Sequence, residues 1–181
     1  MRSRSTYLAV SLVLVAVLIR IAGTRLGLFP RNFSTIGAMT LFAGATLRPR
    51  WLGVSVAAIG LLATDLVLQH NPQWLSVYLP YIIIAIAARS LKPGQSVRSF
   101  ALATVSASLI FFVVSNFGVW AMPEMYDRSL AGLATCYLQA IPFFQNTLAG
   151  DACFGIVLFG SFALLEDRDP AFAEARALSD G

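Results

Sequence analysis

Charged residues are scarce in this 181-residue chain. They make up only 12% of the sequence, whereas 57% of the residues are hydrophobic and the mean hydropathy is +0.74. Soluble domains usually contain about 25% charged residues, so this composition excludes a soluble globular protein. Several apolar segments approach the roughly 20 residues that a helix needs to cross the hydrocarbon core of a bilayer. The sequence therefore indicates an all-α membrane protein whose first partner is the lipid bilayer.

Metal-ligating and basic side chains are also few. The chain has two cysteines, Cys136 and Cys153, and a single histidine, His70, with no Cys-x-x-Cys pair. These residues support neither a zinc site nor a disulfide framework, and we expect no metal and no cofactor. The net charge of +4 is spread along the chain without a basic run, so no nucleic-acid partner is predicted.

Catalytic motifs are missing as well. Ser115, Asp65 and His70 could form a triad in principle, but no nucleophile elbow, no His-Glu-x-x-His and no second histidine accompany them. The intramembrane aspartates also lack the Gly-x-Gly-Asp context of an intramembrane aspartyl protease. Because a catalytic site needs a nucleophile with a base, or a liganded metal, we predict that the protein is not an enzyme.

Hydrophobic segments joined by short linkers predict one transmembrane domain, residues 1–165, built as a six-helix bundle. The first segment resembles a signal peptide, but no cleavage site follows it, so an uncleaved helix is expected. A further apolar segment, 130–144, is short and contains Pro142; we predict a re-entrant or interfacial helix there in preference to another crossing. A polar cytoplasmic tail, 166–181, completes the chain. The six expected spans are 6–21, 33–47, 51–69, 74–91, 100–122 and 147–165.

Basic residues orient these spans, because cytoplasmic loops of membrane proteins are enriched in arginine and lysine. With both termini in the cytoplasm, nine bases lie inside, namely Arg2, Arg4, Arg48, Arg50, Arg89, Lys92, Arg98, Arg168 and Arg176. Four bases, Arg20, Arg25, Arg31 and Arg128, then lie outside. These four either weaken the assignment or mark an entrance that attracts anions.

Polar residues at membrane depth suggest a binding site. An ionisable group in the bilayer core costs roughly 2.5–3.5 kcal/mol and usually faces a bundle interior or a wet cavity. The predicted topology places Asp65, Asn116 and Asp151 in the outer third of the membrane. We expect an outward-facing pocket there, with aromatic walls at Trp74, Tyr78, Phe117, Trp120, Tyr137, Phe143 and Phe144. The predicted substrate-binding residues are Asp65, His70, Asn116, Trp120, Tyr137, Asn146, Thr147 and Asp151.

Structural roles for these residues stay open as alternatives. Asp65 or Asp151 could satisfy free backbone amides where helices break, or pair with Arg25 or Arg31. The aromatic residues could form an interfacial belt, and His70 could be an ordinary loop residue.

Long sequence motifs resemble a known family. The segments 31–45, Ser115-Asn-Phe-Gly-Val-Trp120, 130–137, Ala140-Ile-Pro-Phe-Phe-Gln-Asn-Thr-Leu-Ala-Gly-Asp151 and Leu158-Phe-Gly160 resemble bacterial membrane proteins described as transport proteins and grouped as domain of unknown function 6580. In size and helix layout that family is similar to the S-components of energy-coupling-factor vitamin transporters. The resemblance implies an outward-facing pocket for a vitamin-sized molecule and a location in the bacterial inner membrane.

The resemblance also implies an energising transporter module as a partner. S-components dock on that module through an Ala-x-x-x-Ala pattern in the first helix, whereas here Val13 follows Ala9 and Arg20 follows Ala16 at this spacing. The cysteine that the related solitary cobalamin transporter uses as a cobalt ligand has no counterpart in 70–81; His70 and Cys136 are the two residues that could replace it.

We therefore expect a small-molecule binding and uptake component, with a vitamin or cofactor precursor as the leading substrate class. The alternative is a membrane scaffold or assembly protein whose polar residues only stabilise helix breaks.

Overall fold

The fold is described from a computed structural model, in which residues 2–68, 74–91, 96–122 and 125–168 are placed. Within these ranges the chain is helical and contains no β-strand. The all-α prediction is therefore confirmed. His70 and residues 169–181 of the predicted tail lie outside the described residues.

Four helices are long and apolar enough to cross a membrane, over 4–25, 51–68, 97–121 and 130–166. Two other apolar helical stretches, 36–46 and 75–90, are shorter. In chain order the elements are α1 (Arg2–Arg25), α2 (Ile36–Thr46), α3 (Arg50–Leu68), the π-helical turn η1 (Trp74–Tyr78), α4 (Leu79–Ala87), the 3-10 turn η2 (Ala88–Ser90), α5 (Val97–Ala121) and α6 (Leu130–Arg168).

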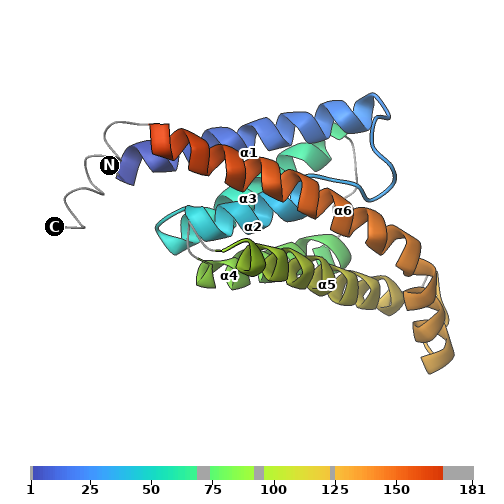
Figure 1. The fold of residues 1–181 in the computed structure, drawn as a ribbon. Coiled ribbons are helices and arrows are strands. Elements are labelled where there is room, and N and C mark those ends of the chain that lie inside the picture. The colour runs from blue at the N-terminus through green and yellow to red at the C-terminus, as the bar shows by residue number, and fades with distance from the viewer. Residues whose placement is uncertain (1, 69–73, 92–95, 123–124, 169–181) are drawn as a thin grey trace.

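Successive helices run in alternating directions along one bundle (Figure 1). The start of α1 and the end of α6 lie at the same end, where Ser5 Oγ donates a hydrogen bond to Glu166 Oε1 over 3.2 Å. The turn between α2 and α3 lies at this end too (Figure 1). The loop 26–35, the end of α5 and the start of α6 lie at the opposite end (Figure 1), which we call the loop end.

Helix α2 lies at the centre of the bundle. Every residue from Ile36 to Ala45 is buried, and α2 packs against α1, α3, α4, α5 and α6. Small residues permit this close packing: a Cβ added at Gly44 would come within 2.5 Å of the Ala85 carbonyl oxygen, and one at Gly53 within 2.5 Å of the Ala43 carbonyl oxygen. Such residues let helix backbones approach closely in membranes, where packing replaces the hydrophobic effect.

The segment 130–144 and the last predicted span form one helix in the structure. α6 continues through residues 145 and 146, where the sequence analysis places a connection, and it contains Pro142 within its length. Membrane helices tolerate proline because neighbouring groups satisfy the carbonyl that it frees. The part of α6 near its start turns away from the line of the remainder (Figure 1), as is common beside a proline.

Replacing Gly44 by valine should destabilise the bundle, because the new side chain collides with the backbone at Ala85. Overpacking of this kind costs about 1–3 kcal/mol, so the melting temperature of the purified protein in detergent should fall. The matched control is Gly160→Val in α6, where an added Cβ meets no atom within 4 Å. Equal melting temperatures for the two variants would contradict the central packing of α2.

Candidate functional site

A cavity of about 230 Å³ lies beside the loop 26–35, between η1, α5 and α6. Its polar lining residues are Asn32, Ser76, Ser115, Asn116 and Thr147, and its apolar lining residues are Val77, Phe111, Phe112, Val119, Ala140, Phe143 and Phe144. None of these residues is charged. The cavity thus combines aromatic walls with a few uncharged polar groups, as small-molecule sites commonly do.

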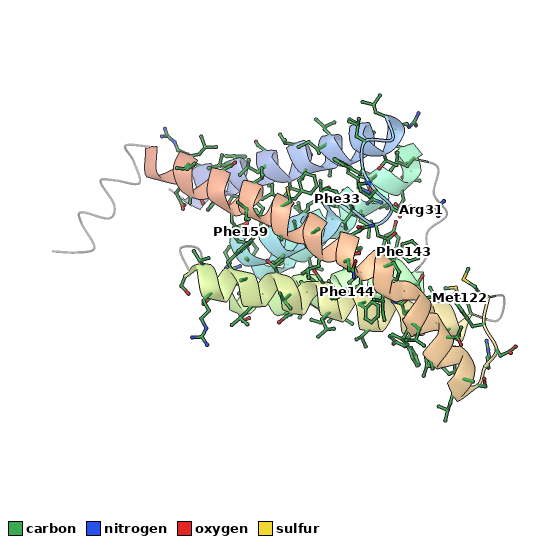
Figure 2. The ribbon with its side chains drawn as sticks, turned by 45° about the vertical axis from the view of Figure 1, so that its right-hand side comes forward. Arg31, Phe33, Met122, Phe143, Phe144 and Phe159 are labelled. Carbon is green, nitrogen blue, oxygen red and sulfur yellow. The ribbon has the colours of Figure 1, made fainter. Side chains whose placement is uncertain are left out.

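Aromatic side chains from α5 and α6 build the walls. The ring of Phe112 lies against that of Phe144, with centroids 5.0 Å apart, and Tyr81 stacks on Phe111 at 4.8 Å. Figure 2 shows Phe143 and Phe144 on α6, in the part of the helix nearer the loop end. Consecutive phenylalanines on both helices therefore line the same cavity.

Hydrogen bonds within the protein already use part of the polar lining. Asn116 Nδ2 donates to the Phe112 carbonyl oxygen over 2.7 Å, and Thr147 Oγ1 donates to the Phe143 carbonyl oxygen over 3.1 Å. The hydroxyl of Ser115 makes no hydrogen bond to any described residue. Asn116 Oδ1 and the lone pairs of Thr147 Oγ1 consequently remain available as acceptors.

Asp151 lies one helical turn beyond Thr147, deeper in the bundle, and is only 4% exposed. Its Oδ2 accepts a hydrogen bond from Ser108 Oγ over 2.7 Å, and its carboxylate accepts another from the backbone N–H of Ala38. A Cβ at Gly37 would collide with this carboxylate. Asp151 therefore binds the N-terminus of α2, where free N–H groups and the helix dipole favour a negative charge.

This contact replaces the usual side-chain cap of α2. Thr35 occupies the N-cap position but makes no capping bond, because its hydroxyl donates to the Ala16 carbonyl oxygen on α1 over 3.1 Å. The first turn of α2 is thus satisfied partly by Ser34, whose Oγ accepts a hydrogen bond from the Ile36 N–H over 3.2 Å, and partly by Asp151, which lies more than 100 positions later in the chain.

Asp65 belongs to a second buried cluster. Its Oδ1 lies 3.3 Å from Nη2 of Arg20 on α1, and its Oδ2 accepts a hydrogen bond from the Tyr78 hydroxyl over 3.0 Å. Arg20 Nη1 also donates to Thr64 Oγ1 over 2.7 Å. The ion pair predicted as an alternative role for Asp65 therefore forms with Arg20 and not with Arg25 or Arg31. Asp65 does not line the cavity.

Three other predicted residues make structural contacts away from the cavity. Trp120 Nε1 donates to the Asp127 carbonyl oxygen over 3.1 Å, Tyr137 donates its hydroxyl hydrogen to the Val113 carbonyl oxygen over 2.6 Å, and Asn146 Nδ2 donates to the Arg31 carbonyl oxygen over 2.9 Å. Of the seven predicted residues that the structure describes, Asn116 and Thr147 line the cavity.

Tertiary contacts bring in residues that the sequence pattern did not single out. Asn32 joins the cavity from the loop, with a positive φ of 64° that asparagine tolerates better than most residues. Ser76 joins it from η1. Neither position stands out in the hydrophobic pattern of the chain. Across the described residues, no group of three or more His, Cys, Asp or Glu side chains gathers as a metal site would require.

Asp151→Ala should destabilise the protein more than Asp151→Asn. Alanine leaves the Ser108 hydroxyl and the Ala38 N–H without an acceptor, at a cost of about 1–3 kcal/mol for each buried group. Asparagine keeps one acceptor oxygen. Melting temperatures in detergent provide the measurement, and a smaller loss for alanine than for asparagine would contradict the proposed binding of the α2 N-terminus.

Breaking the Arg20–Asp65 pair should be costly for either single replacement, because one buried charge remains unpaired. Such losses reach about 3–5 kcal/mol, whereas replacing both partners by apolar residues can be nearly neutral. We expect Arg20→Met with Asp65→Leu to melt closer to the wild type than Arg20→Met alone. Additive losses in the double variant would show that the two charges act independently.

Sequence comparisons place the chain in a family. Searches among curated proteins and among solved structures found no match. A family described as a family of unknown function matches residues 2–172, which is nearly the whole chain. The protein therefore belongs to the family of unknown function DUF6580.

Proposed function

We propose that this protein binds a small molecule and takes part in its uptake across the bacterial inner membrane. The observation that carries this proposal is the cavity of about 230 Å³, which combines aromatic walls with uncharged polar groups. Its volume lies below the range of typical ligand pockets, which begins at about 300 Å³, so only a small ligand fits. A compact vitamin or cofactor precursor is the substrate class that fits this size best.

The proposed topology has six crossings with both termini in the cytoplasm, so the cavity opens toward the outside. The contact between Ser5 and Glu166 supports an even number of crossings, because it joins the first and last helices at one end. The basic turn between α2 and α3, with Arg48 and Arg50, lies at this same end (Figure 1). A basic end favours the cytoplasmic side.

An energising module would have to dock on a different part of α1 from the one that S-components use. Ala9, Val13 and Ala16, which lie along one side of α1, are each no more than 2% exposed and pack into the bundle. The outward-facing part of α1 carries larger residues, such as Tyr7, Leu14 and Leu18. Uptake without a dedicated module is therefore the simpler form of the proposal.

The scaffold alternative also has specific support. Asp151 and Asp65 make the contacts expected of residues that stabilise helix ends and helix pairs, and neither lines the cavity. The two proposals differ in what they require of the cavity residues. Ligand binding needs their polar atoms, whereas a scaffold needs only their volume.

Thr147→Val should reduce the amount of small molecule that stays bound during purification in detergent. Valine keeps the shape of threonine but removes an acceptor, and one lost hydrogen bond corresponds to about a five- to tenfold weaker affinity. Native mass spectrometry measures the retained ligand. The matched control is Thr135→Val in the same helix: its hydroxyl also donates to the carbonyl four residues earlier, but it is exposed and outside the cavity.

Two results would count against uptake. If the wild-type protein carries no small molecule, or if Thr147→Val and Thr135→Val retain equal amounts, the scaffold proposal gains. The melting temperatures of both variants must remain close to that of the wild type, so that a change in retention reports on binding and not on folding.

A further inference from the structure

We infer that the cavity selects an uncharged, planar ring that carries N–H or O–H hydrogen-bond donors. This inference rests on the proposed function and names the chemical class of its ligand. It follows from three properties of the cavity: the absence of charged lining residues, the aromatic walls, and the hydrogen-bonding state of its polar atoms.

Two charges near this region, those of Asp151 and Arg20, are already engaged with other groups. Asp151 binds Ser108 and the N–H of Ala38, and Arg20 binds Asp65 and Thr64. Arg31 precedes the lining residue Asn32, but its own side chain is exposed and does not line the cavity. An ionised ligand would therefore lose its hydration without gaining a counter-charge, which is strongly unfavourable.

The walls favour a flat ligand. Phe111, Phe112, Phe143 and Phe144 contribute four aromatic rings from two helices, and two of these rings pack at a centroid distance of 5.0 Å. Aromatic groups prefer offset-stacked or edge-to-face contacts, which add about 0.5–1.5 kcal/mol beyond the burial of area. A saturated ring of the same size gains free energy from the burial of its surface but lacks the additional contribution of aromatic contacts.

The polar atoms favour a ligand that donates hydrogen bonds. Thr147 uses its hydroxyl hydrogen on Phe143, and Asn116 uses one amide hydrogen on Phe112. Both side chains therefore present oxygen acceptors to the cavity, while Asn116 keeps a second amide hydrogen and Ser115 keeps its hydroxyl hydrogen as donors. A site built to accept hydrogen bonds discriminates against analogues that lack the donor, because its buried oxygens are then left unpaired.

Four small probes separate these properties. Nicotinamide is uncharged and planar and carries an N–H₂ donor. N,N-dimethylnicotinamide removes the donor, nicotinate removes the donor and adds a negative charge, and cyclohexanecarboxamide keeps the amide but removes the planarity and the ring nitrogen. Saturation-transfer NMR on the purified full-length protein measures the weak binding expected of such fragments. We expect nicotinamide to bind and each of the other three to bind at least about fivefold more weakly.

Variants in α6 show whether a signal comes from the cavity. Ala140→Phe places a ring in the cavity, because Ala140 lines it, and should abolish the nicotinamide signal. Ala134→Phe adds the same ring at an exposed position outside the cavity and should leave the signal unchanged. Correct folding of Ala140→Phe is checked by its melting temperature, and Thr147→Val provides a milder second variant.

The inference is overturned if nicotinate or cyclohexanecarboxamide binds as tightly as nicotinamide, or if no probe gives a signal that Ala140→Phe removes. A co-purified molecule of other chemistry, retained by the wild type and lost in Thr147→Val, would overturn the ligand class and leave the proposed function standing. The absence of any retained molecule would instead count against the proposed function itself.

Discussion

The carboxylate of Asp151 holds the N-terminal turn of α2, the short helix that is buried at the centre of the bundle. The first turn of α2 has free backbone N–H groups inside the bundle, and Asp151 on α6 binds this turn at Ala38 while Ser108 holds the carboxylate from α5. The contact requires Gly37, because any side chain there would collide with Asp151. Since α2 touches every other α-helix of the bundle, this interaction helps to fix the relative positions of α2, α5 and α6.

The need to satisfy polar groups inside the membrane also explains the contacts that several arginines make. Unsatisfied polar groups in hydrocarbon cost several kcal/mol each, and cations stabilise the carbonyl ends of helices. Arg25 donates to the Val67 carbonyl oxygen near the end of α3, and Arg128 donates to the Ala121 carbonyl oxygen at the end of α5. Arg20 neutralises Asp65. Three of the four bases that the proposed topology places outside therefore have a structural partner.

Engaging these charges elsewhere leaves the cavity neutral. Charged side chains connect the helices of the bundle, whereas the cavity is lined by phenylalanines, hydroxyls and carboxamides. The proposed division of roles is physically consistent: helix ends and helix pairs need charges to satisfy buried groups, while a pocket for an uncharged ligand is best built without them.

The sequence alone determined the helical membrane character, because apolar run length and low charge dictate it. It also identified Asn116 and Thr147, since polar residues stand out in apolar helices. Only the tertiary structure decided that Asp65 pairs with Arg20, that Asp151 binds α2, and that Asn32 and Ser76 reach the cavity. It likewise joined 130–144 and 147–165 into α6. The side-chain contacts join residues that lie far apart in the chain. Hydrophobic periodicity cannot encode such contacts, because it reports which groups avoid lipid but not which partners satisfy them.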